Sequence, residues 1–238
     1  MDDNIIDCDT GNVEVCDGDY ESRLHKSVAR FVKRADKDYP DWSERHDNGE
    51  WEIDLDEFYD MCNVIFEIIE TISCDEATEQ MLDDILFGIA RDNECSRIIE
   101  VLLKFPEWYA LLCRQVLSTD YINAKWQFAE SLRDYNGKNE IKDLIFDFLR
   151  VDDEYTQRLA LKSLAYIYPD KAEKYAVQFW HRDKYKDDAY ASEYQKIMAL
   201  HVLHMIDSSV LEKYLNLADK SEYYYLKENA KEIRKMIS

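Results

Sequence analysis

Two histidines in this 238-residue sequence have a spacing that could support metal chemistry. His201, His204 and Asp207 follow one another at three-residue intervals, so one helix would present all three on the same side. Zinc, however, needs three or four ligands and partners that orient them. Both histidines stand among residues with a core-like pattern, such as Val202 and Leu203, and buried or groove histidines are commoner than ligands. We therefore expect no metal here.

A calcium site and a catalytic site are also not expected. Residues 47–58 partly resemble the calcium-binding loop of an EF-hand. When Asn48 and Gly49 are placed at the turn of that loop, however, Leu55 occupies the last loop position, which needs a bidentate glutamate. The sequence has no Gly-rich phosphate loop, no G-x-S-x-G motif and no H-E-x-x-H motif. The 51 carboxylates make chance acid–base pairs inevitable, so none can be singled out. We predict that the chain is not an enzyme and uses no cofactor and no small-molecule substrate.

The best candidate for a binding site is the stretch 179–194, FWHRDKYKDDAYASEY. It combines tyrosines with charges of both signs, which is the chemistry of protein-binding hot spots. The candidate contact residues are His181, Arg182, Tyr185, Asp187, Asp188, Tyr190 and Tyr194. The alternative is a solvated loop whose tyrosines lean on the next pair of helices. The chain has seventeen tyrosines, more than a core needs, so some of them, including members of the run 223–225, are expected on the surface.

A second candidate region lies in the first quarter of the chain. Residues 39–54 form the only long irregular stretch, and Trp42 and Trp51 within it are either docking residues or anchors that pin the loop to neighbouring helices. A cluster of carboxylates begins at the end of this stretch. Its members are Asp54, Asp56, Glu57 and Asp60.

The charge of the chain is strongly asymmetric. The formal net charge is −21, and residues 1–120 carry 31 acidic against 11 basic side chains, a net of −20. Residues 121–238 carry 20 against 19, a net of −1. Nucleic-acid phosphates would be repelled by such a surface, whereas a basic protein would be attracted. We expect a basic protein partner and no nucleic acid, although the charge could instead serve solubility alone.

Composition indicates an all-α fold. Five glycines and three prolines are too few for the many turns that a β-rich chain of this length would need. No run of 18 apolar residues is present, so we expect no membrane span. The first residues, MDDNIIDCD, are acidic where a secretory signal is basic, which predicts a cytoplasmic protein.

The element that organises the second half is the stretch 153–169. Asp153 is a ready N-cap, Leu161, Leu164 and Ala165 recur at helical spacing, and Pro169 ends the run. The stretch also fits the second-helix pattern of HEAT repeats, Asp-x-x-Val-Arg-x-x-Ala-x-x-Ala-Leu. The matching residues are Asp153, Thr156, Gln157, Ala160, Ser163 and Leu164, with Thr156 and Gln157 departing from the usual Val-Arg pair.

The same pattern recurs along the chain. Phe128, Ala199 and Ala230 take the place of Ala160, at successive intervals of 32, 39 and 31 residues, and the stretch 179–194 fills the longest interval. First-helix candidates lie between the copies at 139–149, 170–181 and 208–218. This resemblance implies an α-α superhelix of HEAT-like helical hairpins.

We divide the chain into two regions, and the resemblance to HEAT repeats implies that they form one continuous solenoid. Residues 1–118 form an acidic, divergent N-terminal helical region, with a short hairpin or flexible arm at 1–18 and the loop at 39–54. Its expected helices are 19–38, 55–72, 75–91, 95–105 and 106–118. Residues 119–238 form the HEAT-like repeats.

The small, acidic, helical-repeat chain is similar to bacterial immunity proteins that neutralise polymorphic or contact-dependent toxins. Many such toxins are basic nucleases, and the resemblance implies one-to-one binding to a cognate basic toxin. Two alternatives remain: a scaffold or adaptor in a cytosolic assembly, and a HEAT-type DNA glycosylase. The glycosylase would need a basic groove, and lysines and arginines are matched or outnumbered in both halves of the chain.

Overall fold

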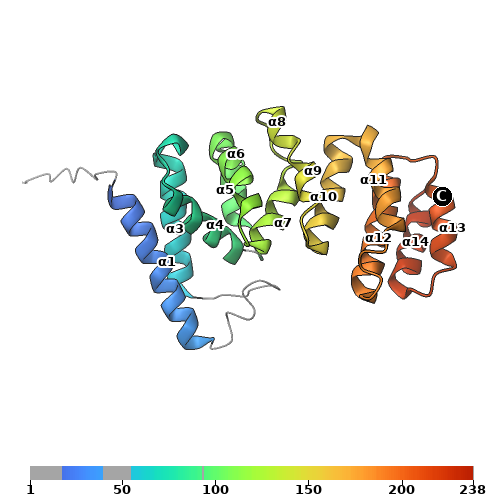
Figure 1. Ribbon diagram of the computed structural model, residues 1–238, viewed down its shortest axis with the longest axis horizontal. Coiled ribbons are helices and arrows are strands. Elements are labelled where there is room, and N and C mark those ends of the chain that lie inside the picture. The colour runs from blue at the N-terminus through green and yellow to red at the C-terminus, as the bar shows by residue number, and fades with distance from the viewer. Residues whose placement is uncertain (1–17, 40–54, 93, 238) are drawn as a thin grey trace, which may run out of the picture.

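The chain is helical throughout the part that the structure describes, as its composition predicts. The computed structural model describes residues 18–39, 55–92 and 94–237, and every regular element in these ranges is an α- or 3-10 helix (Figure 1). None of these helices combines the length and the apolar character that crossing a membrane requires. Residues 1–17 of the predicted hairpin or arm and residues 40–54 of the predicted loop, which include Trp42, Trp51 and Asp54, lie outside the described residues.

The helices follow one another with short connections. In chain order they are α1 (Gly18–Asp38), α3 (Asp56–Thr71), η1 (Cys74–Glu76), α4 (Glu79–Arg91), α5 (Arg97–Leu102), α6 (Pro106–Gln115), η2 (Val116–Ser118), α7 (Ile122–Ser131), α8 (Asn139–Lys142), α9 (Ile145–Phe148), α10 (Glu154–Ile167), α11 (Pro169–His181), α12 (Ala189–Met205), α13 (Leu211–Asp219) and α14 (Tyr224–Ile237).

One row of helices forms the spine of the molecule. Helices α1, α4, α7, α10, α12 and α14 each pack against the next, and we call this series the main row. The remaining helices pack beside it, as α3 does on α1, α11 on α10 and α12, and α13 on α14. Figure 1 shows the series spread along the long axis, with α1 at one end and α13 and α14 at the other. A single apolar core runs through it from Leu24 to Ile233.

The N-cap and the buried side of α10 are those that the sequence predicts. The Asp153 side chain accepts a hydrogen bond from the Thr156 backbone N–H at 2.7 Å, so it caps the helix as expected. Ala160, Ser163 and Leu164 have no exposed surface. The residues that align with these three in α7, α12 and α14 are also buried, apart from the half-buried Arg234. The predicted register therefore describes which side of each of these helices enters the core.

Several predicted helices are shorter or interrupted in the structure, as α5 (Arg97–Leu102) is within 95–105 and α13 (Leu211–Asp219) is against 208–218. The helix expected over 75–91 begins at Glu79, where Thr78 accepts a hydrogen bond from Met81, because residues 74–76 form the 3-10 turn η1. The helix expected over 139–149 is broken into α8 and α9. Between these two pieces the backbone N–H groups bond three residues back instead of four, which tightens the chain and interrupts the helix.

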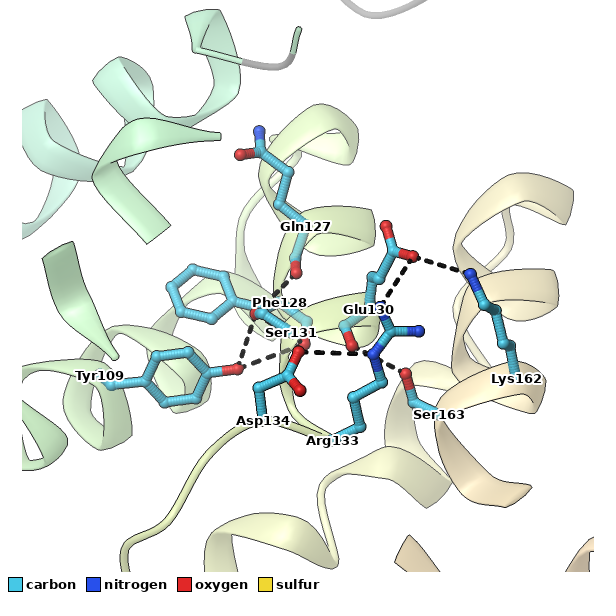
Figure 2. Close-up of polar contacts among 9 residues, drawn as sticks. All are labelled: Tyr109, Gln127, Phe128, Glu130, Ser131, Arg133, Asp134, Lys162 and Ser163. Carbon is cyan, nitrogen blue, oxygen red and sulfur yellow. Dashed lines mark hydrogen bonds and ion pairs between the residues drawn. The ribbon is translucent and has the colours of Figure 1, made fainter. Parts of the chain in front are cut away.

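Polar contacts join the middle of the main row (Figure 2). The Tyr109 hydroxyl of α6 lies 2.9 Å from the Ser131 hydroxyl of α7. Across the next interface, Ser163 of α10 donates a hydrogen bond to the Glu130 carbonyl oxygen at 2.9 Å. The Lys162 ammonium pairs with the Glu130 carboxylate at 3.1 Å. These contacts tie α7 to α6 and to α10 and satisfy polar groups at closely packed interfaces.

Asp153→Ala is expected to lower the free energy of unfolding by about 1 kcal/mol, because it removes the cap of α10 and leaves a backbone N–H without its partner. Urea unfolding followed by circular dichroism measures the change. Asp170→Ala is the matched control, since Asp170 lies in the first turn of α11, where no side-chain cap is present. An equal loss in both variants would show that general charge near the helix ends matters more than the capping bond.

Candidate partner-binding surface

Two residues of the predicted binding stretch turn inward and fasten it to the main row. The Arg182 Nε donates a hydrogen bond to Gln195 Oε1 at 2.6 Å, and its guanidinium lies 3.6 Å from the centre of the Phe179 ring. The Tyr185 hydroxyl donates to Gln157 Oε1 at 3.0 Å. Burial lowers the pKa of Arg182. These two side chains therefore act as anchors of the loop between α11 and α12 more than as an open contact surface.

The other predicted polar members of the stretch have separate roles. His181 Nε2 lies 3.1 Å from the Tyr214 hydroxyl, on the side of α13. Asp188 caps α12 by accepting a hydrogen bond from the Ala191 N–H at 3.0 Å, and Asp187 is exposed. The structure thus does not gather all seven predicted residues into one patch.

Tyr190 and Tyr194 belong to a larger surface that extends beyond the predicted stretch. Their neighbours come from the beginnings of the adjacent main-row helices and from the middle of α7. We call this surface the aromatic stripe, and its members are Trp126 of α7, Tyr155 and Arg158 of α10, Tyr190 and Tyr194 of α12, and Tyr224 and Tyr225 of α14.

Ring contacts make the stripe continuous. The Trp126 and Tyr155 rings have centroids 5.3 Å apart, and the Arg158 guanidinium lies 4.9 Å from the ring centres of both Tyr155 and Tyr194. From Tyr194 the stripe continues to Tyr190 at 4.2 Å and to Tyr225 at 6.5 Å. Tyr225 then contacts Tyr224 at 5.3 Å. Interaction with the Tyr190 side chain raises the pKa of Tyr194.

An ion pair holds the arginine of the stripe in place. Arg158 Nε lies 3.2 Å from Glu154 Oε1, and the two side chains are only 14% and 12% exposed. Burial raises the pKa of Glu154, while Arg158 and Arg182 act in the opposite direction. A guanidinium fixed between two tyrosine rings combines stacking with cation–π attraction, so it rigidifies this part of the surface.

The stripe could have been predicted from tyrosines that share one position of the repeat pattern. Tyr155, Tyr194 and Tyr225 each stand five residues before the template alanine of their helix, at intervals of 39 and 31 residues. Equivalent positions of successive helices in the main row lie beside one another, so tyrosines at one template position form a line. The predicted contact residues do not include Tyr155, Arg158 and Trp126, because these three lie outside the insertion that lengthens one repeat.

The predicted acidic cluster lies elsewhere. Asp56, Glu57 and Asp60 are on α3, at the opposite end of the molecule from α12 and α14 (Figure 1). They line a groove of about 350 Å³ together with cationic side chains of α1, such as Lys33 and Lys37. Arg30 approaches Asp60 at 3.9 Å, so the nearby cations offset much of the local negative charge.

The histidine pair has no metal-binding partners among the described residues. His201 Nε2 lies 2.8 Å from Asn229 Oδ1, a side-chain hydrogen bond between α12 and α14. No group of three or more His, Cys, Asp or Glu side chains in residues 18–39, 55–92 and 94–237 is arranged to hold a metal ion.

The chemistry that the stripe offers is non-covalent contact. Aromatic rings supply large, rigid, amphipathic area, and the tyrosine hydroxyls supply hydrogen bonds at its edge. Comparisons of the chain with protein-family models, with curated proteins and with solved structures find no match.

Proposed function

We propose that the chain is a protein-binding module and that the aromatic stripe is its principal contact surface. The observation that carries this proposal is the exposure of four neighbouring tyrosines. Tyr155, Tyr190, Tyr224 and Tyr225 are between 41% and 65% exposed, although their rings belong to one connected set. Single exposed apolar residues are ordinary on protein surfaces, whereas a contiguous aromatic patch is typical of an interface.

Rigidity supports the same proposal. The loop that leads into α12, the helix of Tyr190, is fastened through Arg182 and Tyr185, and the Lys184 ammonium pairs with Asp152 at 2.6 Å. Arg158 is fixed by Glu154. Side chains that are ordered before binding lose less conformational entropy when a partner docks, so such a surface can bind tightly.

The partner that we propose is a basic protein, bound one to one. The net charge of −21 favours a cationic partner and raises its rate of encounter. Together with the HEAT-like pattern, this charge suggests the role of an immunity protein that inhibits a basic toxin. A scaffold that uses the same stripe for another protein is the alternative, and the two roles differ in the identity of the partner.

Affinity capture tests the proposal. The full chain and the variant Tyr190→Ala/Tyr225→Ala are used as bait in a lysate of the source cells, and bound proteins are identified by mass spectrometry. We expect a stoichiometric basic protein with the parent chain and at least tenfold less of it with the variant, since each buried aromatic anchor contributes about 2 kcal/mol or more. The bait variants are first checked for unchanged melting.

Tyr166→Ala serves as the matched control. Tyr166 is 59% exposed on α10 but lies beside Arg133, outside the stripe. Equal capture by the parent, the stripe variant and the control would place the interface elsewhere. The immunity role has its own readout: co-expression with a toxic protein encoded beside the gene of this chain should restore growth with the parent and not with the stripe variant.

A further inference from the structure

We propose that the free end of the aromatic stripe, formed by Tyr190, Tyr224 and Tyr225, receives arginine side chains of the partner. This inference rests on the proposed function and names the chemistry that the stripe recognises. It is drawn from three features of the surface: an arginine already stacked within the stripe, uncovered rings beyond it, and carboxylates fixed at the helix ends beneath it.

Arg158 provides the internal example. Its guanidinium lies 4.9 Å from the ring centres of Tyr155 and Tyr194, so one part of the stripe is already a tyrosine–arginine–tyrosine stack that bridges α10 and α12. The planar guanidinium can lie against aromatic faces on both sides, which the compact, strongly hydrated ammonium of lysine does less well.

The rings at the free end of the stripe have no guanidinium or ammonium group stacked on them among the described residues. Tyr190, Tyr224 and Tyr225 are 62%, 65% and 54% exposed. In the described parts of the chain, cations lie over many other aromatic rings, including Tyr155, Tyr185 and Tyr214, but none is found over these three. The faces of tyrosine rings carry negative potential, so the free end of the stripe offers unused sites for a cation.

The N-termini of the helices that carry the stripe determine whether the surface favours a positively or a negatively charged ligand. A bare helix N-terminus carries about half a positive elementary charge and would favour an anion. Here one backbone N–H at the start of each helix is already bonded to a carboxylate. Asp153 accepts from Thr156 of α10, Asp188 from Ala191 of α12, and Glu193 from Leu226 of α14 at 2.9 Å. Each full negative charge outweighs the partial positive charge, so the surface disfavours phosphate or acidic ligands and suits a cation.

Binding of oligo-arginine and oligo-lysine peptides of equal length to the full chain tests this inference. Both peptides experience the same long-range attraction to an acidic protein, so the ratio of their dissociation constants isolates stacking. At roughly physiological ionic strength, where long-range attraction is partly screened, we expect oligo-arginine to bind about fivefold more tightly, as one or two exposed cation–π contacts would give. Isothermal titration calorimetry measures both constants.

The preference should disappear in Tyr190→Ala/Tyr224→Ala/Tyr225→Ala and persist in Tyr166→Ala. These tyrosines are exposed, so the triple variant is expected to fold, which a melting curve verifies. Equal affinity for the two peptides, or an arginine preference that survives in the triple variant, would overturn the inference. The capture experiment is independent of it: a partner lost from the stripe variant together with equal peptide affinities would retain the proposed function and reject only arginine recognition.

Discussion

Leu164→Asp is expected to unfold the chain or to lower its free energy of unfolding by at least about 5 kcal/mol. Leu164 has no exposed surface, and it lies in α10, the helix that packs on α7, α9, α11 and α12. Losing a buried leucine side chain costs about 2–5 kcal/mol, and placing an unpaired carboxylate in an apolar interior costs several more. Domains of this kind are stable by only about 5–15 kcal/mol in total.

Tyr166→Asp is the control for this substitution. Tyr166 is two residues further along the same helix and is 59% exposed, so the same new charge stays in water. We expect a change within about 1 kcal/mol, chiefly from an acidic group near the C-terminal end of a helix. Urea unfolding monitored by circular dichroism distinguishes the two variants. A Leu164→Asp protein as stable as the Tyr166→Asp protein would mean that the register of α10 is wrong.

Tyr194→Ala/Tyr225→Ala is expected to accelerate dissociation of the captured partner by roughly 30-fold to 1000-fold, corresponding to about 2–4 kcal/mol for loss of aromatic anchors. Tyr194 is the junction of the stripe, because it contacts Arg158, Tyr190 and Tyr225. Its removal separates the stripe into three parts: Tyr155 with its neighbours Trp126 and Arg158, Tyr190, and the α14 tyrosines. Most effects of interface substitutions fall on the dissociation rate, which biolayer interferometry with the purified partner measures.

Neutralising Asp56, Glu57 and Asp60 as amides gives the contrasting variant. These residues lie on α3, at the far end of the molecule from the stripe, so the dissociation rate should stay within a factor of about two. Any effect should fall on association and diminish with added salt. If the amide variant dissociated as fast as the tyrosine variant, the partner would also contact α3, and the stripe alone could not be the interface.

The sequence by itself determined the helical class and the register of the helices that were matched to the repeat pattern. The reason is local: hydrogen bonding within a helix fixes a period of 3.6 residues, so the spacing of Ala160, Ser163 and Leu164 already indicates the side that must be buried. Asp153 as the cap of α10 follows from chemistry within one turn. The breaks at η1 and between α8 and α9 did not follow, because i→i+3 bonding leaves the apolar pattern nearly unchanged.

Only the tertiary structure decided which polar and aromatic residues share a surface. The sequence marked Arg182 and Tyr185 as contact residues, yet both turn inward because Gln195 and Gln157 on neighbouring helices offer hydrogen-bond partners. The repeat register gives Tyr155 and Tyr225, which are seventy residues apart, the same template position, but it does not show whether their rings are exposed or belong to one connected set. Packing of α10, α12 and α14 side by side brings these rings into one stripe, because the rotation and spacing of the helices are set by the core between them.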